Sequence, residues 1–256
     1  MKEQRWEEAR RLRTDTEALK PEHRNVGKLR QVTATSPESV DRVTQLGRLG
    51  KGRVNYQAIQ TDFDRIAELA RGGWNHNSHY HEFLLKQLPA HCAEALEIGC
   101  GTGAFLRLLA KRSDRVLALD LSPRMIQIAR ERSRQYPNIE FQIADATTWA
   151  YPTERFDCVA SLATLHHLPA EDTLSKMRNA LGTSGTLIVL DLFQGQGLSD
   201  VLTSLLAVPV QAGLKLLKTG RLRDPRQVRE AWAEHGRHDS YPTLSQVRQI
   251  CAAVLP

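Results

Sequence analysis

The sequence has few aromatic residues, no long apolar run and only four cysteines. Aromatic residues make up 6% of its 256 positions. No apolar stretch approaches the ~20 residues that a transmembrane helix needs, and the N-terminus carries no apolar segment typical of a secretory signal. We therefore expect a cytoplasmic protein. The scattered cysteines contain no C-x-x-C pair, which argues against a disulfide framework and a structural zinc site; they are Cys92, Cys100, Cys158 and Cys251.

Charge is unevenly distributed along the chain. Residues 1–53 hold 13 Lys and Arg against 8 Asp and Glu, whereas the remaining residues hold 22 against 21. This predicts a basic, partly helical extension over 1–53 and a separate domain over 54–256. A basic arm could meet nucleic acid or another anionic partner. Proteins that bind single-stranded nucleic acid commonly place aromatic side chains among the basic ones. Trp6 is the only aromatic residue in this segment, so a solvated tail is favoured and nucleic acid is not an expected partner.

Three histidines lie close together before the first predicted strand, at His76, His79 and His81. His76 and His79 are three positions apart and could share one helical face. No acidic or thiol residue stands at a matching spacing, so we expect no metal site here. A cover over a nearby pocket is the favoured interpretation, with plain surface polarity as the alternative.

The most informative stretch is Leu96–Gly103. Ala93, Ala95, Leu96 and Ile98 are typical of a buried parallel strand, and three glycines at alternate positions follow it. The apolar pattern from Ala104 to Lys111 then predicts a helix packed on a sheet. A strand that turns through glycines into a helix points backbone N–H groups and a positive helix end at any ligand over the turn.

Four further apolar segments read as strands, with helical patterns between most of them. They span Arg115–Asp120, Ile139–Ile143, Phe156–Leu162 and Gly185–Asp191. This alternation predicts an α/β fold: a doubly wound, mainly parallel, Rossmann-like sheet of at least five strands with helices on both faces. Ligands of such sheets bind outside the carboxyl ends of the strands, and polar residues cluster at those ends here.

The glycine spacing distinguishes two families. A dinucleotide fold uses G-x-G-x-x-G. The pattern here is acidic-x-Gly-x-Gly-x-Gly, which resembles the first motif of class I methyltransferases that use S-adenosylmethionine. The resemblance covers about Phe63 to Asp191. It implies a cofactor site whose residues we expect to be Glu97, Gly99, Cys100, Gly101, Gly103, Asp120, Leu121, Met125, Asp145, Ala146 and Ser161.

The resemblance also implies what these residues would do. Glu97 and the glycine turn would cradle the amino acid part of the cofactor and its sulfur. Asp120, 17 residues past Gly103, would accept hydrogen bonds from the ribose hydroxyls. Asp145 and Ala146 would face the adenine, on which Met125 could pack. S-adenosylmethionine is thus the expected cofactor.

The methyl acceptor is less well defined. Ser161–Thr164 lacks the Pro-Pro-aromatic run of relatives that methylate base amines, and Cys158 lies inside a strand and not at its tip, so it is a poor nucleophile. Leu165–Leu168 resembles a run common in members acting on small molecules. His166 and His167 are therefore the candidate catalytic residues, since an imidazole could take a proton from the acceptor. The alternative is that one of them only packs the following helix.

The C-terminal part predicts a helical lid over 197–240, with a membrane-surface contact as a less favoured alternative. Class I methyltransferases end with two more strands, and nothing after Tyr241 reads as a strand pair. We therefore expect these strands to be missing, so that the fifth strand needs a cover from residues 1–53 or a second chain.

A small-molecule methyltransferase is the leading prediction. The alternatives are a nucleic-acid or protein methyltransferase and a non-catalytic cofactor-binding remnant. The oligomeric state is left open.

Overall fold

The computed structural model describes residues 55–69, 76–195 and 208–255, except for 211, 214, 218–219, 221–222, 238 and 240. The predicted extension over 1–53 and the first part of the predicted lid lie outside these residues. Within the described residues, no helix is long and apolar enough to cross a membrane.

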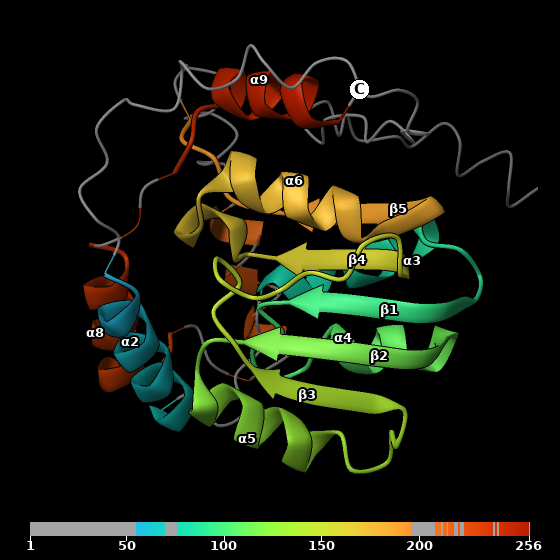
Figure 1. Cartoon of the computed structure of the whole chain (residues 1–256). Coiled ribbons are helices and arrows are strands. Elements are labelled where there is room, and N and C mark those ends of the chain that lie inside the picture. Colours follow the sequence, from blue (N-terminus) through green and yellow to red (C-terminus); the bar gives the residue numbers. More distant parts are fainter. Residues whose placement is uncertain are drawn as a thin grey trace, which may run out of the picture. The chain divides into compact units, whose positions relative to one another are not determined.

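Five parallel strands form the sheet in the order β3-β2-β1-β4-β5 (Figure 1). Residues alternate between the two faces of each strand, so that Ala118 and Leu119 join different apolar clusters. The sheet confirms the predicted parallel Rossmann-like architecture. Its strands are β1 (Cys92–Ile98), β2 (Ser113–Asp120), β3 (Ile139–Ile143), β4 (Phe156–Leu162) and β5 (Leu181–Leu190).

Helices cover both faces of the sheet, as expected. Side chains of α3 (His81–Gln87) and α4 (Leu106–Leu109) join one apolar cluster. Those of α6 (Ala170–Ala180) and α9 (Leu244–Val254) join the other. Three short 3-10 helices complete these layers: η2 (His76–Tyr80), η3 (Ala110–Arg112) and η4 (Leu165–His167).

Three further helices meet beside the carboxyl ends of the strands. α2 (Tyr56–Leu69) packs against both α5 (Pro123–Arg132) and α8 (Arg226–His235), as Figure 1 shows. Ser122 caps α5 because its hydroxyl accepts the Met125 N–H at 3.0 Å. Side chains from all three helices share a small apolar cluster. The sheet end that binds ligands in this architecture is therefore flanked by α2 and α8.

The main differences from the sequence prediction concern where elements begin and end. The helix after the glycine turn is short and continues as η3, and β5 begins at Leu181 with a register shift against β4, four residues before the predicted start. Beyond β5, the described residues form helices and one isolated bridge between Gln194 and Thr243, but no further strand. Within the described part of the chain β5 therefore pairs only with β4.

Candidate functional site

The three glycines after β1 form a turn that only glycine adopts easily. Gly99, Gly101 and Gly103 have φ angles of +72°, +51° and +76°. A Cβ on Gly99 would lie 2.0 Å from Oγ1 of Thr164, so this turn packs directly on the loop that follows β4. A Cβ on Gly101 would meet no atom within 4 Å. Gly101 thus faces open space, where a ligand can approach the backbone.

Asp120 ends β2 beside this turn. One of its oxygens accepts the Gly101 N–H at 2.7 Å and the other accepts the Ser122 N–H at 2.9 Å. These bonds fix the carboxylate, and each oxygen retains a lone pair for a ligand hydroxyl. Burial raises the pKa of Asp120 from 3.8 to about 6. The Asp120 carboxylate can therefore accept hydrogen bonds from two adjacent ligand hydroxyls, as expected for a ribose.

Glu97 lies at the other side of the turn and is 2% exposed. Its Oε2 is buried without a hydrogen-bond partner among the described residues. Burial, and then the negative charge of Asp120, hold the pKa of Glu97 well above its usual range. A buried carboxylate without a donor is unfavourable, so a cationic ligand group at this position would stabilise it.

Asp145 follows β3 at the same edge of the sheet. One of its oxygens, Oδ1, accepts hydrogen bonds from the amide and the hydroxyl of Thr147, at 2.8 and 2.7 Å. These bonds hold the carboxylate in a tight local turn. Ala146 beside it is buried, at 8% exposed. Asp145 thus lies just beyond β3 at the edge where ligands bind, and its contact with adenine stays a prediction.

The remaining predicted cofactor residues are less open. Cys100 and Ser161 are buried, and Leu121 is half-buried. Met125 is 7% exposed and packs with side chains of α2 and α8, including Ile66 and Ala231. Its predicted adenine contact is therefore not visible in this packing, because neighbouring helices already cover most of the side chain.

His166 and His167 lie in η4, directly after the loop that contacts Gly99. Asp191, at the end of β5, accepts the His166 backbone N–H at 2.8 Å, and its other oxygen lies 2.5 Å from His166 Nδ1. Asp191 therefore fixes both the main chain and the ring. With Nδ1 held by the carboxylate, Nε2 carries the nitrogen lone pair. That lone pair can accept a proton or coordinate a metal ion.

His167 belongs to a buried polar group that sequence reasoning missed. Its Nδ1 lies 3.4 Å from Asp239 Oδ1, and Nε2 of His235 lies 3.7 Å from the same oxygen. Burial, and then the neighbouring His166, lower the pKa of His167 to about 4. We call His166, His167, His235 and Asp239 the histidine–aspartate cluster.

Comparisons with known proteins indicate the family of the domain that carries this site. Residues 95–185 match the family model described as a methyltransferase domain. An uncharacterised methyltransferase of Mycobacterium tuberculosis is 36% identical over 120 residues, which cover 46% of this chain and 59% of that protein. A malonyl-[acyl-carrier protein] O-methyltransferase of a Paenibacillus species is 36% identical over 139 residues, covering 49% of this chain and 50% of the relative. Residues 95–185 therefore belong to a class I S-adenosylmethionine-dependent methyltransferase domain.

Solved structures support the fold of this methyltransferase domain. A Haloferax volcanii complex between the Trm112 methyltransferase activator and a methyltransferase matches with a TM-score of 0.51 at 17% identity. The match covers 80% of this chain and 77% of that one. At this identity the likeness concerns the fold. The chain spans between half and about three fifths of the length of the two curated relatives named above.

The domain's residues fit its cofactor, S-adenosylmethionine. The open space at Gly101 gives the ligand access to the backbone, and the unpaired Glu97 oxygen offers a partner for its ammonium group. The anchored Asp120 carboxylate suits the ribose diol. All three features lie at the carboxyl ends of β1 and β2, where this architecture binds ligands.

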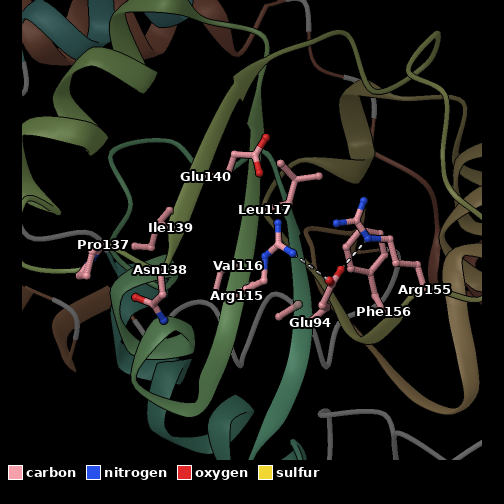
Figure 2. A pocket seen from close by; sticks show the side chains of 11 residues that line it. Glu94, Arg115, Val116, Leu117, Pro137, Asn138, Ile139, Glu140, Arg155 and Phe156 are labelled. Carbon is pink, nitrogen blue, oxygen red and sulfur yellow. Dashed lines mark hydrogen bonds and ion pairs between the residues drawn. The ribbon is translucent and has the colours of Figure 1, made fainter.

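The hollow in Figure 2 is a different feature. It has a volume of about 200 Å³ and lies over β1, β2 and β3, with Phe156 at the start of β4 in its lining. At its rim, Glu94 lies between the guanidinium groups of Arg115 and Arg155, at 3.6 and 2.5 Å. This hollow is built around residues near the amino ends of β2 and β4, so we do not assign the methyl-transfer site to it.

Proposed function

We propose that this protein transfers the methyl group of S-adenosylmethionine to a small-molecule acceptor. The observation that carries the proposal is the Asp120 carboxylate, held by Gly101 and Ser122 in front of an open glycine turn. A nucleoside ligand with two adjacent hydroxyls fits this arrangement. The bound cofactor supplies an activated methyl group on a sulfonium, so the chain needs mainly to align the acceptor and exclude water.

The acceptor side of the proposed site is the η4 region. Thr164 touches the glycine turn, which brings His166 and His167 close to the cofactor pocket. The His166 side chain is 5% exposed and is fixed by Asp191. An acceptor with a hydroxyl or an acidic carbon must lose a proton on methylation, and His166 is positioned to assist that loss.

The small-molecule class is supported by relatives of this chain. One is named as a malonyl-[acyl-carrier protein] O-methyltransferase, and another, from Tropheryma whipplei, as a demethylmenaquinone methyltransferase. Each of these names points to an acceptor outside the nucleic acids. For this chain we therefore propose a small-molecule acceptor and no particular compound.

The experiment is a methyl-transfer screen with labelled S-adenosylmethionine. The full chain is offered carboxylate, phenol or quinol, and amine acceptors, together with RNA and a protein mixture as competing classes. We expect transfer to one small-molecule class and at least a hundredfold loss in His166→Asn, with Asp114→Asn as an exposed control. Transfer only to RNA or protein would overturn the assignment of the acceptor.

A further inference from the structure

One carboxylate oxygen in the histidine–aspartate cluster lacks a hydrogen-bond donor. The side chain of Asp239 is 6% exposed, and its Oδ1 has no hydrogen bond within the described residues. Its other oxygen, Oδ2, accepts the hydroxyl of Tyr241 at 2.7 Å. Tyr241 therefore sets the orientation of the carboxylate, and Oδ1 faces the imidazoles of His167 and His235, at 3.4 and 3.7 Å.

The imidazole rings near this oxygen lie close to one another. The ring centroids of His166 and His167 lie 3.8 Å apart, and those of His167 and His235 lie 5.0 Å apart. Phe63 packs against both His167 and His235, and Asp62 Oδ2 lies 3.4 Å from His235 Nδ1. The cluster thus brings one buried carboxylate oxygen and several imidazole nitrogens together, which are the kinds of donor atom that a metal cation binds.

We propose that His166, His167 and Asp239 bind one divalent transition-metal ion. Each residue offers one ligand atom, and these atoms lie within 4.8 Å of one another. Two neutral imidazoles and one carboxylate form a donor set that suits zinc, iron or nickel better than magnesium or calcium. A single cation would satisfy the orphaned Asp239 oxygen and both imidazole lone pairs.

The supporting contacts resemble those of known metal sites. Histidine ligands commonly donate their second ring nitrogen to a carboxylate, which fixes the ring. His166 has this arrangement because Nδ1 lies 2.5 Å from Asp191, leaving Nε2 for the metal. Ligand atoms of a tetrahedral zinc ion lie about 3.3 Å apart, given bonds of about 2.0 Å. The 3.4 Å separation of His167 Nδ1 and Asp239 Oδ1 already matches this spacing.

The site has a direct consequence for the reaction, which rests on the function proposed above. Three protein ligands leave a coordination position for water or an acceptor oxygen. A hydroxyl bound there would ionise more readily, since a metal ion lowers the pKa of a bound hydroxyl. His166 would then act as a ligand, and the metal would take over the activation of the acceptor.

The test is a zinc titration of the metal-free full chain, followed by competition with a coloured zinc chelator. We expect one zinc ion per chain. Asp239→Asn and His167→Gln should each weaken binding at least a hundredfold, since even the loss of an outer partner commonly costs 10- to 100-fold. His91→Asn is the matched control, because His91 pairs with Asp114 at 2.8 Å on the exposed surface.

Two further measurements distinguish a failure of the metal site from a failure of the proposed function. Circular dichroism establishes that each variant is folded, and calorimetry with S-adenosylmethionine reports the cofactor pocket independently. Zinc binding that is lost in both cluster variants but kept in His91→Asn supports the site. Zinc binding that is absent in the wild type, or equal in wild type and Asp239→Asn, overturns it. If the cofactor still binds in that case, the proposed function stands without the metal. Zinc binding without cofactor binding would instead overturn the proposed function.

Discussion

Alanine at Gly99 should mainly destabilise the fold, whereas alanine at Gly101 should mainly weaken cofactor binding, although both glycines have positive φ angles. A left-handed alanine costs about 1–2 kcal/mol at either position. Alanine at Gly99 also brings Cβ to 2.0 Å from Thr164 Oγ1, 2.5 Å from its Cγ2 and 2.7 Å from its Cβ. Because even the Thr164 Cβ is too close, the whole side chain must move. Such overpacking adds about 1–3 kcal/mol.

We therefore expect Gly99→Ala to lower the free energy of unfolding by about 2–5 kcal/mol. Gly101→Ala should lower it by only about 1–2 kcal/mol, since its Cβ meets nothing within 4 Å. That Cβ would occupy the space where the cofactor approaches the turn. The affinity of Gly101→Ala for S-adenosylmethionine should fall at least tenfold, or about 1.4 kcal/mol.

The assay combines urea unfolding of the cofactor-free proteins with calorimetric titration of the cofactor. A double variant, Gly99→Ala with Thr164→Gly, supplies a control because it removes the clash but keeps the backbone strain. Its coupling energy should recover most of the overpacking contribution. Equal destabilisation by the two single variants, or wild-type cofactor affinity in Gly101→Ala, would refute this account of the turn.

Three further predictions concern the charged groups. Asp120 must be ionised to accept two ribose hydroxyls, and burial raises its pKa to about 6. Cofactor affinity should therefore fall about tenfold between pH 7 and pH 5, and titrations across that range should show a weaker dependence in Asp120→Asn. Glu97→Gln removes an unpaired buried carboxylate, so urea unfolding should show unchanged or greater stability. Calorimetry should show weaker cofactor binding by this variant. A loss of stability would contradict the role assigned to Glu97. His166→Asn should lower turnover at least a hundredfold and Asp191→Asn at least tenfold, both with the cofactor dissociation constant unchanged. A matching loss of cofactor binding would contradict their assignment to the acceptor side of the site.

The fold was predictable because its main signals are local. Each of β1 to β4 is a short apolar segment that ends at or just before a polar residue or a turn, and Ser122–Pro123 marks the start of α5. The capping box of Thr243 and Gln246 marks the start of α9 in the same local way. Element ends were less predictable. The first four residues of β5 are Leu181, Gly182, Thr183 and Ser184, which show no apolar strand pattern, yet pairing with β4 extends the strand over them.

That the predicted cofactor residues lie at one edge of the sheet was predictable for a similar reason. Glu97 and Asp120 lie at the carboxyl ends of β1 and β2 and Gly101 follows β1 closely, and parallel strands bring these ends to one edge. The histidine–aspartate cluster was not predictable, because α8 and the segment after it supply His235 and Asp239 to a loop far earlier in the chain. A histidine followed four residues later by an aspartate is too common a pattern to signal such a site.

The measurement that tests the central claim most directly is calorimetric titration of the full chain with S-adenosylmethionine and with its demethylated product. We predict saturable binding of both compounds that is lost in Asp120→Ala. Asp114→Ala should bind like the wild type, since Asp114 lies on the same strand with its side chain 65% exposed. A folded wild-type protein that binds neither compound, or binding that survives Asp120→Ala unchanged, would contradict the assignment.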